Sequence, residues 1–336
     1  MSIKIGINGF GRIGRCVYRV ALQREGISVV GVNDIAEPRA LAYLLKYDTV
    51  MGRLDADVSL EGDTLVVADE RSRLLAERDP AALPWKDLGV DFVVEATGRF
   101  KSRADLQKHL DAGAPRVVLT VPPADELDAT VVLGVNEEVL TADARLVSNA
   151  SCTTNCLGPL AKVLHGAFGI DKGLMTTVHA YTNDQRLAEV PDHKDLRRSR
   201  AAAENIIPTT TGAARAVGKV MPELAGRLDG VAMRVPIPDG STVDLVAELQ
   251  SEVTAEEVNR VVREAAEGPL RGIIQYNEEP LVSSDIIGNP HSCIYDAELT
   301  QVTGGRLLRC VAWYDNEWGY SNRVVDLIER LHRLAS

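Results

Sequence analysis

Residues 3–15 read IKIGINGFGRIGR, and this stretch decides the fold of the N-terminal part of the chain. Its apolar run at residues 3–7 predicts a short buried strand that stops at glycines. A helical pattern then runs from Gly11 to about Arg24. A strand, a glycine-rich turn and a helix in this order predict the first part of a strand–helix–strand unit.

The same alternation continues through the first half of the chain. The segment at residues 102–113 has a helical pattern and ends in a glycine stop signal. Repeated strand–helix–strand units predict an α/β fold, with a mostly parallel, doubly wound sheet of the Rossmann type. Further buried strands are predicted at residues 28–34, 91–97, 116–121 and 145–150.

The pattern changes after Ser151. A helix is predicted at residues 256–268, and an amphipathic helix at residues 321–335. We therefore expect an α+β second domain with a mixed or mostly antiparallel sheet, and domain limits at residues 1–151, 152–316 and 317–336. The strand-like runs of the second domain lie at residues 242–249, 272–276 and 306–314.

Composition and charge narrow the class of protein. The 336 residues suit two domains, and 45% apolar with 25% charged residues is typical of soluble globular proteins. A net charge of −11 argues against nucleic acid or an anionic membrane as a general partner. The N-terminus lacks the pattern of a signal peptide, no apolar run suits a membrane span, and five scattered cysteines indicate a reducing cytoplasm.

Gly9, Gly11 and Gly14 form a G-x-G-x-x-G motif between the first strand and its helix. Gly9 permits the tight turn, Gly11 lets a pyrophosphate approach the backbone, and Gly14 allows close packing of the helix on the sheet. Asp34 ends the second strand, where a carboxylate can accept hydrogen bonds from ribose hydroxyls and repel a 2′-phosphate. The motif favours NAD as cofactor; the alternative is that Asp34 merely caps a loop.

Cys152 follows a predicted strand and small polar residues that are typical of a helix N-cap. A helix start lowers the pKa of a thiol, so Cys152 is a candidate nucleophile. Cys156 lies four residues later, but one such pair is no zinc site, and we interpret Cys156 as a core residue. His179, at the end of an apolar run, is a candidate base, although a lone histidine there is more often structural.

Several segments resemble glyceraldehyde-3-phosphate dehydrogenase, of the phosphorylating, NAD-type family, and the resemblance runs in order from Asn8 to Leu327. The segment around Cys152 is the most specific of them. The matching segments are NGFGRIGR (8–15), EATGRF (95–100), SNASCTTNC (148–156), TTVHAYTNDQ (176–185), HKDLRRSRAAAENIIPTTTGAARAV (193–217), RVPIPDGSTVDL (234–245), PLVSSDIIG (280–288) and WYDNEWGYSNRVVDL (313–327).

The resemblance implies oxidation of glyceraldehyde 3-phosphate to 1,3-bisphosphoglycerate with NAD, through a thiohemiacetal and then a thioester on Cys152. His179 would be the base, and no metal is implied. A cytoplasmic homotetramer is implied, with the C-terminal helix packing back on the first domain. The implied cofactor-binding residues are Gly9, Gly11, Arg12, Ile13, Asp34, Arg78, Thr97, Thr120, Asn316 and Tyr320.

Two anionic groups must be held beside the thiol in this reaction: the phosphate of the substrate and inorganic phosphate. Arg234 lies between apolar residues, which favours a partly buried anion partner, whereas Arg198 lies in a basic segment that could also be a solvated patch. Pro191 matches the NAD-type residue of the family. The residues that the resemblance implies for phosphate binding are Ser151, Thr153, Thr182, Arg198, Thr211, Gly212 and Arg234.

Two alternatives stay open on the sequence alone. Residues 119–136 depart from the usual family pattern, and residues 125–132 and 289–297 are similar to erythrose-4-phosphate dehydrogenase, a close relative. The segments at residues 179–185 and 208–217 favour the triose enzyme. A non-enzymatic binding protein on the same scaffold is the other alternative, and the presence of both candidate catalytic residues argues against it.

Overall fold

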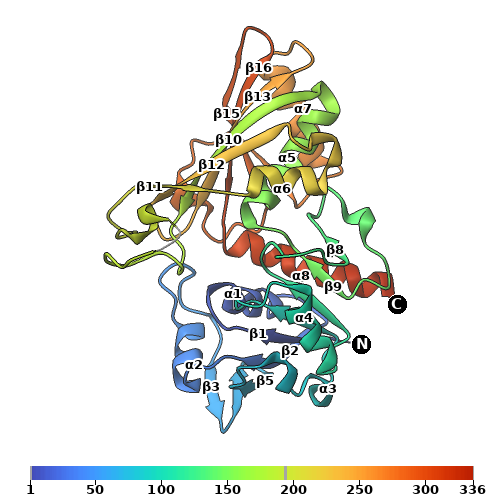
Figure 1. Cartoon of the computed structure of the whole chain (residues 1–336), viewed down its shortest axis with the longest axis vertical. Coiled ribbons are helices and arrows are strands. Elements are labelled where there is room, and N and C mark those ends of the chain that lie inside the picture. The colour runs from blue at the N-terminus through green and yellow to red at the C-terminus, as the bar shows by residue number, and fades with distance from the viewer. Residues whose placement is uncertain (1, 193–194, 336) are drawn as a thin grey trace. The chain divides into compact units, whose positions relative to one another are not determined.

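The computed structural model describes residues 2–192 and 195–335, and it divides the chain into two compact units (Figure 1). Unit 1 contains the described residues of 1–131, 138–151 and 321–336. Unit 2 contains residues 132–137 and the described residues of 152–320. Each unit is built around a sheet of its own.

Unit 1 contains a sheet with the strand order β3-β4-β5-β2-β1-β6-β7-β9-β8. Pairing is parallel from β5 through to β8 and antiparallel at the β3–β4–β5 edge. This confirms the predicted Rossmann-type sheet. The strands are β1 (Ile3–Asn8), β2 (Ile27–Asn33), β3 (Val58–Glu61), β4 (Thr64–Val67), β5 (Glu70–Leu75), β6 (Phe92–Glu95), β7 (Arg116–Leu119), β8 (Ala129–Thr130) and β9 (Leu146–Ser148).

The helices of unit 1 follow local sequence signals. Ser102 accepts a hydrogen bond from the N–H of Asp105, and the Asp105 carboxylate accepts one from Ser102, so a capping box begins α4. Arg24 donates to the carboxylate of Asp326 at 3.0 Å and ties α8 to the end of α1. The helices are α1 (Arg12–Ala21), α2 (Pro38–Lys46), α3 (Trp85–Leu88), α4 (Arg103–Asp111) and α8 (Trp318–Ala335), with short 3₁₀ turns at Pro80–Ala82 and Glu137–Val139.

The strands β3, β4 and β5 at the antiparallel edge are not among the strands that the sequence pattern predicts. Both β3 and β4 are only four residues long, so their alternation is too short to stand out from a loop. Predicted strands also end earlier than expected where the backbone turns into loops; β6 stops at Glu95 rather than at residue 97. That early end places Thr97 in a turn beyond the strand.

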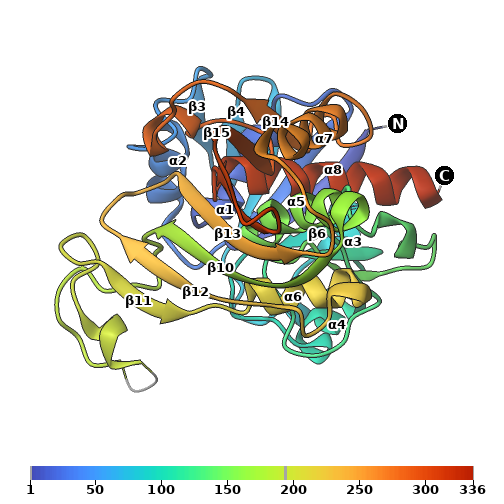
Figure 2. The ribbon, with the colours of Figure 1, turned by 90° about the horizontal axis from the view of Figure 1, so that it is seen from above.

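Unit 2 contains a mixed, mostly antiparallel sheet with the order β11-β12-β10-β13-β16-β15-β14, as predicted. Parallel pairs occur between β10 and β12 and between β14 and β15. Figure 2 shows β10, β12 and β13 side by side. The strands are β10 (Ile170–Ala180), β11 (Ile207–Thr210), β12 (Leu228–Val235), β13 (Ser241–Leu249), β14 (Ile274–Asn277), β15 (Cys293–Thr303) and β16 (Leu307–Tyr314).

Helix α5 contacts both α6 and α7, and all three helices pack on this sheet. The apolar side of α5 is buried almost throughout, which fits its long run of small and aliphatic residues. A capping box at Thr254 and Glu257 begins α7. The helices are α5 (Cys152–Phe168), α6 (Ala213–Val220) and α7 (Ala255–Glu267), with 3₁₀ turns at Leu196–Ser199, Pro222–Leu224 and Ser283–Ile286.

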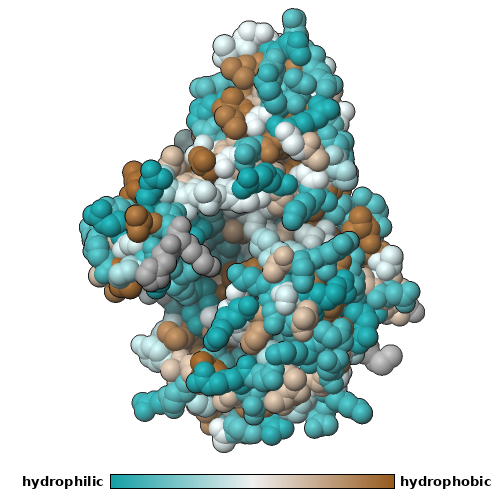
Figure 3. Space-filling model, in the orientation of Figure 1, coloured by the Kyte–Doolittle hydropathy of each residue, from teal (hydrophilic) through white to brown (hydrophobic). Residues whose placement is uncertain are grey.

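Large apolar side chains are exposed on the segment that leads into β11. Leu187 is 87% exposed and Leu196 is 81% exposed, and Ile206 is also exposed. Figure 3 shows brown side chains on this segment, whereas most of the visible surface is hydrophilic. Within residues 2–192 and 195–335, no helix is both long and apolar enough to cross a membrane.

Candidate active site

The turn between β1 and α1 is built by its glycines. Gly9 has a φ of 93°, and its N–H donates to the carbonyl of Asn33 at 2.8 Å. A Cβ at Gly14 would lie 2.1 Å from the Gly9 carbonyl oxygen, so the helix can approach this closely only with glycine there. Gly11 has no side chain, and a Cβ there would meet nothing within 4 Å. The space beside Gly11 at the start of α1 is therefore open. A helix N-terminus beside open space suits an anionic group such as a pyrophosphate.

Asp34 follows β2 and is half buried. One carboxylate oxygen accepts a hydrogen bond from the N–H of Phe10 at 2.8 Å, and the other accepts one from Ala36 at 3.0 Å. Asp34 thus holds the glycine turn against the end of β2, which is the loop-capping role weighed above. Each carboxylate oxygen keeps a further lone pair, so a ribose hydroxyl could still donate to it.

The other predicted cofactor residues of unit 1 differ in their surroundings. Arg12 forms an ion pair with Asp48, and Ile13 is half buried. Arg78 is exposed. Thr97 donates its hydroxyl hydrogen to Glu95, and Thr120 donates its own to the main-chain carbonyl of Glu95.

In unit 2, Cys152 is the first residue of α5, as the helix-start prediction requires. The residue two positions earlier, Ala150, has a φ of 54°, a left-handed conformation that non-glycine residues rarely adopt. Such strain is common at functional turns. The sulfur of Cys152 lies 3.5 Å from Nε2 of His179, so the structure brings the predicted pair together.

Nδ1 of the His179 ring has two close partners. It lies 2.7 Å from the carbonyl oxygen of Ala180, which can only accept, and 2.8 Å from Nη1 of Arg234, which can only donate. Nη1 of Arg234 also donates to the same carbonyl oxygen at 2.9 Å. In the tautomer with the hydrogen on Nδ1, Arg234 acts on the ring through its charge, and Nε2 keeps a lone pair toward the thiol.

The electrostatics of the pair favour the neutral forms. Burial and the charge of Arg234 lower the pKa of His179 to about 3. Burial also raises the pKa of the Cys152 thiol, although Arg234 and hydrogen bonds involving Thr153 act in the opposite direction. The lowered thiol pKa that the helix start predicted is therefore wrong for this state, because desolvation outweighs the helix and the arginine.

Arg234 lies on β12 directly beside His179 on β10, because the two residues are opposite each other in the parallel ladder. Asp184, in the loop after β10, forms an ion pair with Arg198 and accepts a hydrogen bond from the Thr182 hydroxyl. Burial raises the pKa of Asp184, but Thr182, Arg198 and Arg234 together hold it below its ordinary value. Three predicted phosphate-binding residues thus gather around one carboxylate.

The structure brings the residues predicted to bind inorganic phosphate together only in part. Thr153 contacts Cys152, next to Ser151. Thr211 accepts a hydrogen bond from the N–H of Ala213, and Gly212 is the exposed N-cap residue of α6. Among the described residues, no hydrogen bond joins Thr211 or Gly212 to Cys152.

Two residues that the sequence did not single out support this site. The hydroxyl of Tyr314 lies 2.8 Å from Thr153 Oγ1 and 2.9 Å from Thr177 Oγ1, and the Tyr314 ring meets the His179 ring edge to face. Ser241 donates to Oδ1 of the buried Asn316 at 2.6 Å. Tyr314 lies in the WYDNEWGY segment, but only the strand pairing reveals its contacts.

Ser241 also accepts a hydrogen bond from the main-chain N–H of Ala180 at 3.1 Å. Its single hydrogen goes to Asn316, so the Asn316 amide turns its NH₂ group away from Ser241. Tyr320 is buried in the first turn of α8. The first two residues of the matched segment at 193–217, His193 and Lys194, lie outside the described residues.

The parallel sheet with an open glycine turn and the buried cysteine–histidine pair beside arginine define a class: a dinucleotide-dependent dehydrogenase with a cysteine–histidine site. Comparison with known proteins identifies the family. A family model described as the NAD binding domain of glyceraldehyde 3-phosphate dehydrogenase matches residues 3–103, and one described as its C-terminal domain matches residues 151–316. The chain belongs to the glyceraldehyde 3-phosphate dehydrogenase family, whose cofactor is NAD.

Curated relatives support the same family over the full length. A glyceraldehyde-3-phosphate dehydrogenase of Geobacillus stearothermophilus is 59% identical over 328 residues, which is 97% of each chain. Glyceraldehyde-3-phosphate dehydrogenase 1 of Bacillus subtilis is also 59% identical, again over 97% of each chain. A relative from Mycolicibacterium smegmatis is 57% identical over 98% of each chain.

Proposed function

We propose that this chain catalyses the phosphorylating oxidation of glyceraldehyde 3-phosphate to 1,3-bisphosphoglycerate, with Cys152 as nucleophile and His179 as base. The observation that carries the proposal is the 3.5 Å contact between the Cys152 sulfur and Nε2 of His179. Arg234, 2.8 Å from the other ring nitrogen, supplies a cation for an anionic substrate. We further propose that residues 1–151 bind the cofactor, that residues 152–316 carry the chemistry, and that residues 317–336 form a helix packed on the cofactor domain.

The residues of unit 1 fit NAD. The uncovered N-terminus of α1 beside Gly11 would hold the pyrophosphate, and Asp34 would accept hydrogen bonds from the adenosine ribose. When bound, NAD supplies the hydride acceptor of the oxidation. The other proposed cofactor residues are Gly9, Arg12, Ile13, Arg78, Thr97, Thr120, Asn316 and Tyr320.

The first chemical step follows from the two pKa shifts. The thiol is protonated and the imidazole is neutral, so His179 Nε2 takes the thiol proton as sulfur attacks the aldehyde carbon. The imidazolium then returns this proton to the former aldehyde oxygen, which gives a neutral imidazole and a thiohemiacetal with a hydroxyl group. Its hydroxyl proton must then leave as the carbon is oxidised, and the same imidazole nitrogen is the base within reach. A thioester on Cys152 remains.

The second step is attack of inorganic phosphate on the thioester. A C–O bond forms, the C–S bond breaks, and the thiolate of Cys152 is released with the acyl phosphate as product. Arg234 provides the fixed positive charge for the incoming anion, with Ser151, Thr153, Thr211 and Gly212 proposed as further phosphate contacts. Thr182 and Arg198 are proposed to hold the substrate's own phosphate.

A bound phosphate would also tune His179. Arg234 lowers the pKa of His179 through its charge, and an anion paired with Arg234 would offset that effect. The imidazole therefore becomes a stronger base when the substrate is present. The free site is held in an inert state because thiol and base are both neutral.

The proposal is tested by turnover of glyceraldehyde 3-phosphate with NAD, with and without inorganic phosphate. We expect rapid NADH formation that depends on phosphate, and slow turnover without it. Fast phosphate-independent oxidation of erythrose 4-phosphate would contradict the choice of substrate. Absence of NADH formation with either sugar phosphate would contradict the assignment as an enzyme.

We also propose a cytoplasmic homotetramer. The exposed Leu187 and Leu196 on the segment around Pro191 support burial of this segment by a second copy. All five cysteines are free thiols, which suits a reducing compartment. Molar mass measured by light scattering should correspond to four chains; a monomer at micromolar concentration would contradict the assembly.

A further inference from the structure

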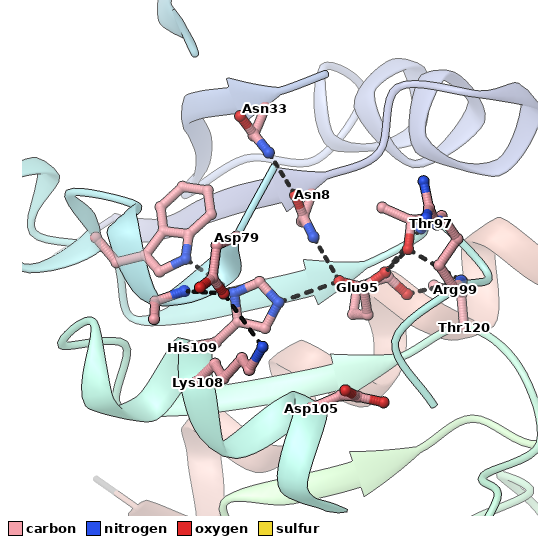
Figure 4. A network of polar contacts seen from close by, with 12 residues as sticks. Asn8, Asn33, Asp79, Glu95, Thr97, Arg99, Asp105, Lys108, His109 and Thr120 are labelled. Carbon is pink, nitrogen blue, oxygen red and sulfur yellow. Dashed lines mark hydrogen bonds and ion pairs between the residues drawn. The ribbon is translucent and has the colours of Figure 1, made fainter. Parts of the chain in front are cut away.

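A buried polar network lies behind the strand ends of the cofactor unit (Figure 4). We call it the Glu95 network; its members are Glu95, Thr97, His109, Trp85, Asn8 and Asn33. Glu95 ends β6, and both Glu95 and His109 are completely buried. Burying a carboxylate costs folding free energy unless hydrogen-bond donors satisfy it. The donors around Glu95 therefore define what each oxygen of its carboxylate binds.

Each oxygen of the Glu95 carboxylate accepts two hydrogen bonds. Oε1 accepts from the main-chain N–H of Thr97 at 2.8 Å and from the Thr97 hydroxyl. Oε2 accepts from the amide of Asn8 at 2.6 Å and from Nε2 of His109 at 3.1 Å. The Thr97 side of the carboxylate thus faces the cofactor turn, and the His109 side faces α4.

The direction of the His109 contact is fixed by Trp85. The indole N–H of Trp85 lies 3.0 Å from Nδ1 of His109, and an indole N–H can only donate. Nδ1 is therefore an acceptor, so the ring is neutral and its single hydrogen lies on Nε2. Nε2 of His109 therefore donates to Glu95 and cannot accept a hydrogen from that side chain.

The direction of the Asn8 contact is fixed in the same way from the other side. The side chain of Asn33 accepts from the N–H of Glu77 at 2.8 Å and donates to the Glu77 carbonyl at 2.9 Å, which determines its amide orientation. Its NH₂ group also donates to Oδ1 of Asn8 at 2.7 Å. The NH₂ group of Asn8 is therefore directed at Glu95. The network has one consistent assignment of its hydrogens.

Thr97 is where this network meets the proposed cofactor site. Its hydroxyl hydrogen is committed to Glu95, and its oxygen also accepts from the N–H of Arg99 at 3.1 Å. Its backbone packs tightly against the glycine turn, since a Cβ at Gly9 would lie 2.6 Å from the Thr97 nitrogen. The Thr97 hydroxyl can thus offer only a lone pair to a ligand.

We propose that Glu95 is a positioning residue for NAD binding, a role that rests on the proposed function. Its carboxylate sets the Thr97 hydroxyl as a hydrogen-bond acceptor and joins the ends of β1, β2 and β6 in a single arrangement. The Thr97 side of the site therefore recognises groups of the dinucleotide that carry a hydrogen to donate, such as a ribose hydroxyl or the amide NH₂.

Glu95→Gln tests the proposal, with NAD affinity measured by calorimetry on the full-length chain. His109 and Asn8 cannot act as acceptors toward this side chain, so the new NH₂ group is directed at Thr97. There it takes a lone pair of the hydroxyl and releases the hydroxyl hydrogen, and the hydrogen bond from the Thr97 main-chain N–H is lost. We expect NAD to bind about tenfold more weakly, the effect of one charge-assisted hydrogen bond. Trp85→Phe is the control. It removes the indole N–H that donates to His109, on the side of the Glu95 network away from Thr97. It should reduce thermal stability while leaving NAD affinity within twofold.

A double variant separates positioning from general loosening. Thr97→Val alone should weaken NAD binding about tenfold. Glu95→Gln in the Thr97→Val background should weaken it by less than Glu95→Gln does in the unaltered chain, because the hydroxyl is already gone and only the acceptor of the main-chain N–H remains to be lost. A combined loss near a hundredfold, or equal losses in Glu95→Gln and Trp85→Phe, would overturn the proposal.

Two further results keep the test decisive. If Glu95→Gln does not fold, Thr97→Ser and Thr97→Val replace it. The Thr97→Ser variant keeps a hydroxyl that can donate to Glu95, so it should bind NAD within twofold of the unaltered chain. The Thr97→Val variant should bind NAD about tenfold more weakly. Equal binding by these two variants would contradict the proposal. An unaltered chain that does not bind NAD would contradict the proposed function itself, a result distinct from any difference among variants.

Discussion

The glycine turn of unit 1 and the cysteine site of unit 2 are built in different ways. At the turn most contacts are made by the main chain: Gly14 packs on the carbonyl of Gly9, and the N–H of Gly9 donates to the carbonyl of Asn33. At the cysteine site, the contacts join side chains far apart in the sequence, with Cys152 on His179 at 3.5 Å. A local motif specifies the first site, whereas the tertiary fold specifies the second.

This difference decides where a single substitution matters. A site made of main-chain groups tolerates changes in most side chains and fails when a glycine gains a Cβ. A site made of converging side chains fails when one functional group is lost, although the fold persists. The predictions below test this contrast, starting from the largest expected effect.

Cys152→Ser should reduce kcat by roughly 10⁴-fold or more, because the hydroxyl is a far weaker nucleophile than the thiol. NAD affinity should stay within about twofold, since the glycine turn is untouched. Steady-state kinetics and calorimetry on the same preparation check both parts. Substantial activity in this variant would break the assignment of the nucleophile.

His179→Asn should reduce kcat by about 10³-fold, within the range expected for loss of a general base. The variant keeps a polar side chain of similar length beside Ala180, so folding should be preserved. Activity should also recover partly as pH rises, because hydroxide replaces the missing base for the thiol. A variant with the pH profile of the unaltered enzyme would argue against the role of His179.

Gly14→Ala should weaken NAD binding by about tenfold to a hundredfold, because its Cβ would lie 2.1 Å from the Gly9 carbonyl oxygen and the turn must shift. Gly11→Ala is the matched control for structure, since a Cβ at Gly11 meets nothing within 4 Å. The thermal midpoint of Gly11→Ala should match the unaltered chain, whereas that of Gly14→Ala should fall. Equal thermal midpoints for Gly11→Ala and Gly14→Ala would contradict the role of Gly14 in the turn.

Acid should destabilise unit 2 through His179. Its pKa is about 3 in the native state and 6.5 ordinarily, so between these values the unfolded chain binds a proton that the native chain does not. Stability is therefore lost as pH falls below about 6, by about 1.4 kcal/mol per pH unit. Urea unfolding should show that the free energy of unfolding falls more between pH 7 and pH 5 for the unaltered chain than for His179→Asn. Equal falls would contradict the shifted pKa.

Tyr314→Phe should have the smallest effect, a severalfold fall in kcat. The change removes a hydroxyl that contacts both Thr153 and Thr177, and one such neutral hydrogen bond contributes about 1 kcal/mol. The buried ring remains, so the thermal midpoint should fall by only a few degrees. A variant with unchanged kcat would show that Tyr314 only fills space beside the ring of His179.

The sequence predicted the parallel sheet and the glycine turn well, because strand, turn and helix signals lie within a few residues of each other. It could also place Cys152 at a helix start, since small polar residues precede it. It could not show that His179 meets Cys152, or that Arg234 lies beside His179, because those contacts arise from strand pairing. Only the resemblance to a family suggested them.

The direction of the thiol pKa shift shows the same limit. The helix start is a local signal and predicted a lowered pKa at Cys152, but burial by residues from other strands raises it. The ion pair between Asp184 and Arg198 also depends on a loop whose path the sequence does not specify. Local patterns predict where a site begins, and the fold determines its electrostatics.

The central claim is that Cys152 forms the covalent intermediate. Mixing the enzyme with glyceraldehyde 3-phosphate and NAD in the absence of phosphate, followed by acid quench and peptide mass spectrometry, tests it directly. We predict a burst of about one NADH per active site and a matching acyl group on the peptide that contains Cys152. An acyl group on another residue, or a burst without any adduct, would contradict the account.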